Sequence, residues 1–338
     1  MRRREKVTSP IAGRCGKMMI GNEAAKDNIG YGKRDLQPKK KDGFKSRRVK
    51  RGLFIAGMLS VGLIQFLVFW VYVNFNSILM AFQTRTRTGV QWGFENFSRF
   101  FREVKIPEME LGLALKNTLL LFVVGTLIGL PASLLFAYYL YKKVRWSGFF
   151  RVVFFLPSII SAAVLVGLFK YVMAVQGPLN GFLSLLTGSP VETEWLTDDN
   201  LAMKTILFYV FWTGFGGNIV LLTGAIHRIS PDILEYAKID GVGMTRELFQ
   251  IIIPLIWPTL STMIVLAVAG LFTNSGPILL FTEGQYKTMT LGYFIFDQVQ
   301  GGQYYYPSAI GLIFTAIGFP LVLIVKYLLG KITEDVEY

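Results

Sequence analysis

The sequence predicts an all-α integral membrane protein with six transmembrane helices. The chain has 338 residues, of which 52% are hydrophobic and only 17% charged, whereas a soluble domain of this length normally carries more charge. Six stretches of at least 18 residues contain no ionisable side chain, and each is long enough to cross about 30 Å of hydrocarbon as a helix. We expect the spans at 53–82, 112–141, 150–173, 205–226, 254–280 and 307–329.

Six spans place both termini on one side of the membrane. Residues 1–51 carry 17 Lys and Arg against 5 Asp and Glu, and cytoplasmic segments collect Lys and Arg. We therefore expect cytoplasmic termini, with a disordered basic tail at 1–51 and a transmembrane domain at 52–338. The net charge of +13 is interpreted as orienting the chain and attracting anionic lipid, with no nucleic-acid partner. Cys15 is the single cysteine, so no internal disulfide is expected.

The first two spans and the segment between them contain residues suited to packing in a membrane. The span at 53–82 is apolar apart from amides such as Gln65, and an aromatic-rich outside segment follows at 85–110. The span at 112–141 contains several glycines and other small residues, which let helices approach closely in lipid.

The third span, at 150–173, has the shortest uncharged stretch, the 18 residues 152–169. Pro157 is expected to kink it, with Ser158 and Ser161 satisfying the backbone groups that a proline leaves without partners. An outside loop with four acidic residues is expected at 175–201, more typical of a solvated loop than of a cation site.

The last three spans hold polar and small residues at membrane depth. The fourth, 205–226, is interrupted by a glycine-rich run with one amide at 213–218, which is costly in lipid unless it faces protein or water. The fifth, 254–280, contains the polar run 273–277. Since the uncharged stretch inside each span contains no Asp, Glu, Lys, Arg or His, the sequence argues against ion-coupled transport and suits a path for a neutral, hydrogen-bonding solute.

A polar loop at 227–254 joins the fourth and fifth spans. Ser230 is suited to cap a helix and Pro231 to occupy its first position. Glu235 and Asp240 are available to bond loop amides or to pair with a basic partner. An ordinary amphipathic linker along the membrane surface is the alternative on composition alone.

Two glycines divide this loop into two short helices. Gly241 and Gly243 are expected to end the first helix, and Thr245 to cap a second one that runs into Pro254.

The run EYAKIDG, followed by I-x-I-P, resembles the EAA loop of ABC importer permeases, whose pattern is E-A-A-x-x-x-G with a later I-x-L-P. Tyr236 stands where the family usually has Ala, and Ile253 replaces Leu. The resemblance implies the type I ABC importer permease architecture, in which the first helix of this loop is the coupling helix and docks in a cleft of the ATPase subunit. It assigns the coupling role to Glu235, Tyr236, Ala237, Ile239, Asp240, Gly241 and Pro254.

Softer patterns resemble the sugar-transporting, maltose-type branch of that family. They lie at 94–101, 117–119, 272–284 and 306–311, so that the resemblance covers about 53–330. They imply import of a sugar, expected to be an oligosaccharide, by alternating access. The alternatives are a permease for another solute, such as a polyamine, phosphate or an amino acid, or a self-contained secondary carrier.

Sugar sites combine aromatic faces with neutral hydrogen-bonding groups. The mid-membrane residues of these types, each of which could instead serve only helix packing, are Trp212, Thr213, Asn218, Phe272, Asn274 and Ser275.

The energy source is expected to lie in other chains. The sequence has no G-x-x-x-x-G-K-[ST] run, so it is expected to bind no ATP itself and to be no enzyme. The resemblance implies two cytoplasmic ABC ATPase subunits that bind ATP and magnesium, a second, homologous but non-identical permease, and an extracytoplasmic solute-binding protein. It also implies a bacterial or archaeal cell membrane. His227 is the single histidine, so neither a metal site nor a catalytic triad is expected.

Overall fold

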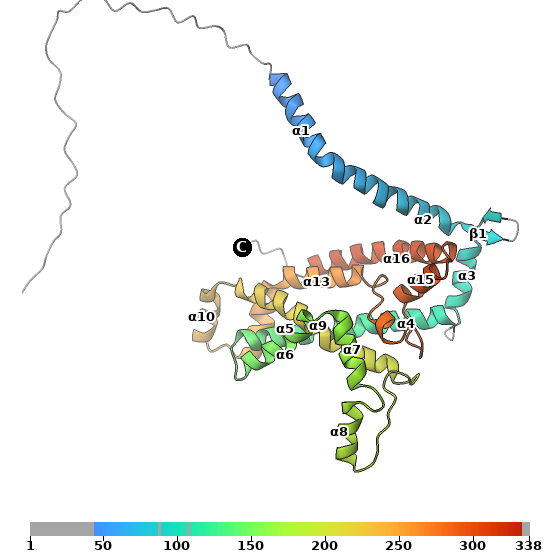
Figure 1. Cartoon of the computed structure of the whole chain (residues 1–338). Coiled ribbons are helices and arrows are strands. Elements are labelled where there is room, and N and C mark those ends of the chain that lie inside the picture. The colour runs from blue at the N-terminus through green and yellow to red at the C-terminus, as the bar shows by residue number, and fades with distance from the viewer. Residues whose placement is uncertain (1–43, 87–88, 107–108, 333–338) are drawn as a thin grey trace, which may run out of the picture. The chain divides into compact units, whose positions relative to one another are not determined.

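The computed structural model describes residues 44–86, 89–106 and 109–332 (Figure 1). The chain divides into two compact units, Met1–Leu63 and Ile64–Tyr338. A helix begins at Phe44, so the last eight residues of the tail predicted at 1–51 are helical and not disordered. The remainder of that predicted tail lies outside the described residues.

The regular elements in the first half of the described chain are helices and one small hairpin. Its elements are α1 (Phe44–Gln65), the π-helical η1 (Phe66–Tyr72), α2 (Val73–Ala81), β1 (Gln83–Thr86), β2 (Gly89–Trp92), α3 (Glu95–Val104), α4 (Glu110–Phe122), the π-helical η2 (Val123–Ile128), α5 (Gly129–Tyr141), α6 (Ser147–Ile159), α7 (Ala162–Val172), α8 (Pro178–Thr187) and α9 (Ala202–His227). The antiparallel pair β1–β2 was not predicted and lies in the aromatic-rich segment after the first span.

The regular elements of the second half are all helices in the part of the chain that the structure describes. Its elements are α10 (Pro231–Ile239), α11 (Met244–Glu247), the π-helical η3 (Leu248–Ile252), α12 (Ile253–Leu255), α13 (Trp257–Ala269), α14 (Ile278–Phe281), α15 (Leu291–Gln300) and α16 (Tyr305–Gly330).

The described helices supply four unbroken candidate spans and two bent ones. The unbroken ones are Val49–Ala81, Glu110–Tyr141, Ala202–His227 and Tyr305–Gly330. The bent ones are Ser147–Ile159 with Ala162–Val172, and Met244–Leu255 with Trp257–Ala269. Counting each bent pair once gives six spans, in the order that the sequence predicts.

The third span is not the single kinked helix that was predicted at 150–173. Pro157 is buried inside α6, and the chain turns by 111° between α6 and α7. The bend lies at Ile160 and Ser161, whose ψ angles of 139° and 134° leave the helical region. The proline is thus accommodated, and the break follows it by three residues.

The fifth span ends earlier than the predicted 254–280. Helix α13 stops at Ala269, and the polar run 273–277 forms a turn. In that turn Gly276 has a φ of +62°, and its amide donates to Asn274 Oδ1 at 2.8 Å. A short polar side chain that accepts a bond from the second amide after it favours a turn over a helix, which explains the early end.

The fourth span is continuous despite its glycine-rich run. Helix α9 passes through 213–218 without a break. A Cβ atom at Gly216 would lie 2.8 Å from Ser158 Cβ, so this glycine marks the close crossing of α9 and α6. The predicted interruption is therefore a packing contact between two helices.

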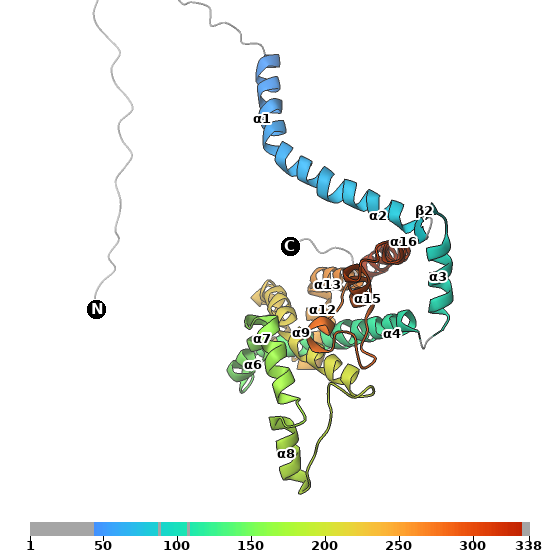
Figure 2. The same ribbon diagram turned by 45° about the vertical axis from the view of Figure 1, so that its right-hand side comes forward.

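The second unit has two distinct ends. Trp257 Nε1 donates to the carbonyl of Leu329 at 3.0 Å, which places the polar loop and the last turns of α16 at the same end. Helices α13 and α16 lie side by side (Figure 1). Helix α8 extends away from the other helices of this unit in both views (Figures 1 and 2).

Candidate coupling loop and solute cavity

Helix α10 begins as the sequence predicts. Ser230 occupies the N-cap position and Pro231 the first turn, although the Ser230 side chain makes no capping bond. Proline fits there because the first amides of a helix have no acceptor within it. The acidic Asp232 also lies in the first turn, where a negative charge is favourable to the helix dipole.

Gly241 ends α10 in a Schellman motif. Its φ is +71°, the amide of Val242 donates to the carbonyl of Ala237 at 2.9 Å, and the amide of Gly241 donates to the carbonyl of Lys238 at 3.1 Å. These two bonds satisfy carbonyls that the helix end would otherwise expose. The left-handed conformation that they require is one that glycine adopts without strain.

The second helix of the loop begins earlier than predicted. Gly243 is its N-cap and Met244 its first residue, so Thr245 lies inside the helix and does not cap it. The helix continues through η3 into α12, which contains Pro254. A bend of 72° then separates it from α13.

Helix α10 has one buried face and one exposed face. Leu234 is 4% exposed and belongs to a core cluster that also contains residues of α5, α9, η3 and α13. Ile239 and Tyr236, in contrast, are 79% and 68% exposed. The helix is therefore packed against the spans on one side and presents large apolar side chains on the other.

The two acidic candidates of the loop are also exposed. Within the described part of the chain, the side chains of Glu235 and Asp240 form no ion pair or hydrogen bond. They are free to contact a partner, and the predicted bonds to loop amides are not formed.

Within the second helix of the loop, Glu247 forms an ion pair with Lys142 that was not predicted from the sequence. Lys142 Nζ lies 2.7 Å from the Glu247 carboxylate, and Glu247 is 2% exposed. In the sequence Glu247 stands between Arg246 and the apolar Leu248, and nothing at that position distinguishes it from a solvated side chain.

A cavity of about 350 Å³ lies between the spans. Asn218 of α9 and Asn274 of the turn after α13 both line it. Thr118 and Thr126, which were not among the predicted candidates, line it as well. None of the described residues that line this cavity is charged.

The other four candidates lie elsewhere. Trp212 lines a separate apolar cavity and stacks on Phe169, with ring centroids 6.4 Å apart. Phe272 packs against Phe314 in another core cluster, at 4.7 Å between centroids. Thr213 Oγ1 donates to the Tyr209 carbonyl, and the carbonyl of Ser275 accepts from Thr290. Contact with a solute stays a prediction for all six.

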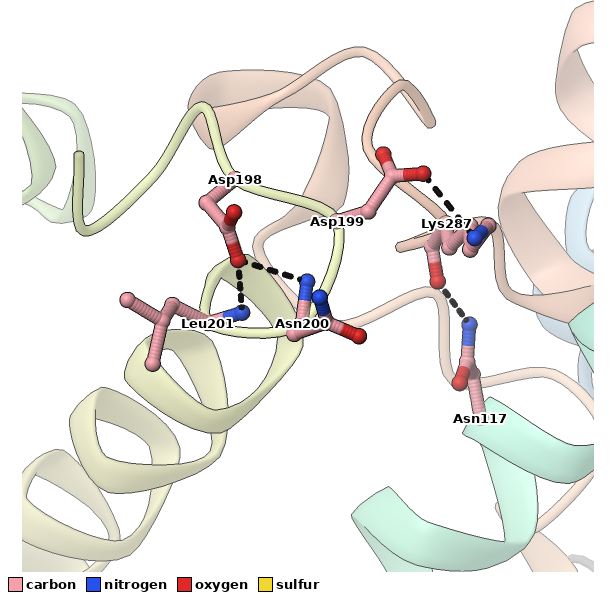
Figure 3. Close-up of polar contacts among 6 residues, drawn as sticks. All are labelled: Asn117, Asp198, Asp199, Asn200, Leu201 and Lys287. Atoms are coloured by element: carbon pink, nitrogen blue, oxygen red, sulfur yellow. Dashed lines mark hydrogen bonds and ion pairs between the residues drawn. The ribbon is translucent and has the colours of Figure 1, made fainter.

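Polar contacts join three segments at the end opposite the loop (Figure 3). Asn117 at the start of the second span donates to the carbonyl of Lys287 at 2.8 Å, and Lys287 Nζ lies 3.0 Å from Asp199. Asp198 Oδ1 accepts from the amides of Asn200 and Leu201, which precede α9. Two acids of the loop predicted at 175–201 therefore have defined structural partners.

The chain matches a known protein family. Residues 129–335, more than half of the chain, match the model of the binding-protein-dependent transport system inner membrane component family. The match contains the whole polar loop and both asparagines of the cavity.

Curated relatives match over most of the chain. The polygalacturonan/rhamnogalacturonan transport system permease protein YteP of Bacillus subtilis (strain 168) is 27% identical over 83% of this chain and 89% of its own length. The multiple sugar-binding transport system permease protein MsmF of Streptococcus mutans is 28% identical, with coverages of 79% and 92%.

The fold has solved counterparts as well. A chain of a bacterial alginate ABC transporter, crystallised in complex with an alginate pentasaccharide-bound periplasmic protein, superposes with a TM-score of 0.74 at 24% identity. The superposition covers 86% of this chain and 98% of the other. Since the spans, the loop between the fourth and fifth of them and the family match all agree, the chain belongs to the inner membrane components of binding-protein-dependent ABC transport systems, as a permease subunit.

Proposed function

We propose that this chain is one of two permease subunits of an ATP-driven importer that carries a saccharide into a bacterial or archaeal cytoplasm. The other permease is a homologous, non-identical chain. Two cytoplasmic ATPase subunits bind ATP and magnesium, and an extracytoplasmic binding protein delivers the solute.

The exposed apolar face of α10 is the observation that carries the proposal. Tyr236 and Ile239 project from a helix whose opposite face, through Leu234, belongs to the core of the spans. An exposed apolar patch with acidic neighbours is typical of a protein–protein interface. A partner that binds this face can therefore move the packed spans, which is what a separate ATPase must do.

The lining of the cavity favours a neutral solute that carries hydroxyl groups. Two asparagines, two threonines and several apolar residues line it. Such a lining bonds sugar hydroxyls, whereas a polyamine or phosphate favours opposite charges in its path. The relatives named for polygalacturonan and for multiple sugars support a saccharide, and we assign the solute-facing role to Asn218 and Asn274.

The substitution Ile239→Asp tests the docking face. A carboxylate in the centre of an apolar contact loses its water and gains no partner, so we expect most of the ATPase to be lost from the complex. The measurement is the ratio of ATPase to permease after purification through a tag on this chain.

Leu185→Asp is the matched control, because Leu185 on α8 is 84% exposed but lies outside the loop. The control is expected to retain the ATPase. Copurification that is unchanged in Ile239→Asp, or reduced equally in both variants, would contradict the assignment of α10 as the docking helix.

A further inference from the structure

The ion pair between Lys142 and Glu247 is buried where the second helix of the coupling loop meets the end of the second span. Lys142 Nζ lies 2.7 Å from both carboxylate oxygens of Glu247, and the two side chains are 15% and 3% exposed. The pair joins residues that are 105 positions apart in the sequence.

The two residues of the ion pair belong to different parts of the fold. Lys142 is the C-cap residue of α5, at the end of the second span. Glu247 is the last residue of α11, which directly follows the α10 helix and its Gly241 turn. A second bond joins the same elements, because Tyr138 Oη donates to the carbonyl of Met244 at 3.3 Å.

Apolar side chains close to the pair in the sequence also pack together. Leu140 of α5 packs in one buried cluster with Leu248 and Ile252 of η3. Apolar contacts are non-directional and resist separation more than they resist sliding or rotation. A short ion pair fixes a direction between two helices, so it restrains the movement that the apolar contacts permit.

Stability alone is a poor explanation for such a pair. Removing two charges from water costs much of what their attraction returns, and a well-packed apolar pair is often as stable. A buried pair is better explained where a fixed geometry between two elements is needed.

The second span leads from the ion pair to the cavity. Thr118, Phe122, Thr126 and Leu130 all lie on α4, η2 or α5 and line the cavity that contains Asn218 and Asn274. A displacement of α11 that is passed to Lys142 therefore reaches the cavity wall through one continuous helical stretch, Glu110–Tyr141.

We propose that the Lys142–Glu247 pair is a positioning link that transmits movement of the coupling loop to the second span, and so to the cavity. The inference rests on the proposed function, because it requires an ATPase to move α10. It assigns a role to two residues outside the EAA pattern.

The test measures the accessibility of the cavity wall, so the solute does not have to be known. The full complex, purified through this chain with its ATPase subunits, is placed in lipid nanodiscs. Cys15→Ser removes the native thiol, and Thr126→Cys introduces a reporter in the cavity wall. The rate of maleimide labelling at the reporter is measured without nucleotide and after trapping with ATP and vanadate. Alternating access predicts a change of about fivefold or more between these two rates.

Three variants are compared in this reporter background. Lys142→Gln breaks the pair, whereas Lys142→Met with Glu247→Leu removes both charges and leaves neither unpaired. Lys142→Arg keeps the positive charge. Lys143→Gln is the matched control, since Lys143 is the exposed neighbour and forms no ion pair in the described part of the chain.

We expect Lys142→Gln and the apolar double variant to hydrolyse ATP while the nucleotide-dependent change in labelling falls to less than about twofold. Lys142→Arg and Lys143→Gln should keep the full change. If Lys142→Gln does not assemble, the apolar double variant carries the test, because it buries no unpaired charge.

Two results would overturn the link. An apolar double variant with the full labelling change would show that packing alone transmits the movement. Loss of the change in Lys143→Gln as well would show a general effect of charge. A reporter complex that binds no ATPase, or shows no response to nucleotide with the pair intact, would instead contradict the proposed function on which the link rests.

Discussion

At the residue scale, Gly241 shows why the loop pattern contains a glycine. Its φ of +71° and the two bonds of the Schellman motif turn the chain sharply between α10 and α11. No atom lies within 4 Å of the place that a Cβ would occupy. The constraint at this position is therefore conformational and not steric.

This distinction gives a prediction for two substitutions. Gly241→Ala should lower the free energy of unfolding by about 1 kcal/mol, because the left-handed conformation is strained for alanine. Gly241→Asn should lose less, since asparagine tolerates that conformation and the site has room for its side chain. Denaturant unfolding of the purified protein in mixed micelles measures both values, and equal losses would contradict a purely conformational role.

At the element scale, the crossing of α6 and α9 depends on one glycine of a pair. Gly216 faces Ser158 and the carbonyl of Phe154, whereas Gly217 has no atom within 4 Å of its Cβ position. The run predicted to interrupt the fourth span thus permits two helices to approach closely, as small residues do in membranes.

The adjacent glycines provide a matched comparison. Gly216→Ala should destabilise the protein by about 1–3 kcal/mol, since the added methyl group forces the two helices apart. Gly217→Ala should be neutral or stabilising by up to about 1 kcal/mol, because alanine favours a helix over glycine. The same micelle unfolding measures both, and similar effects at the two positions would mean that helix propensity, and not the crossing, decides the outcome.

At the scale of the whole molecule, the two ends of the second unit have different chemistry. One end carries the exposed α10 face and the last turn of α16, where Trp257 at the start of α13 donates to the carbonyl of Leu329. The other end carries the network of Asn117, Lys287 and Asp199. A transporter driven by a cytoplasmic ATPase must turn the first of these ends to the cytoplasm.

Orientation can be measured with single thiols in a Cys15→Ser background. Leu185→Cys on α8 should react with a membrane-impermeant maleimide in intact spheroplasts. Lys331→Cys, directly after α16, should react only after lysis. Labelling of Lys331→Cys in intact spheroplasts would contradict the cytoplasmic C-terminus and the docking role of α10 together.

Local signals in the sequence were sufficient for much of this architecture. Uncharged stretches predicted the spans because hydrocarbon excludes ionisable groups wherever they lie along a helix. The start of α10 at Pro231 and its end at Gly241 followed from capping and turn preferences, which depend only on neighbouring residues. The placement of Thr245 as a cap was wrong, because Gly243 already begins the second helix.

The tertiary structure decided what depends on residues that are distant in the sequence. It turned the chain at Ile160 and not at Pro157, and it brought Asn218 and Asn274 to one cavity while Trp212 and Phe272 packed elsewhere. It also paired Lys142 with Glu247, 105 positions away. Hydrophobic periodicity and caps are properties of a segment, whereas a cavity wall or a buried ion pair exists only once separate helices have packed, and for that reason no local pattern predicted them.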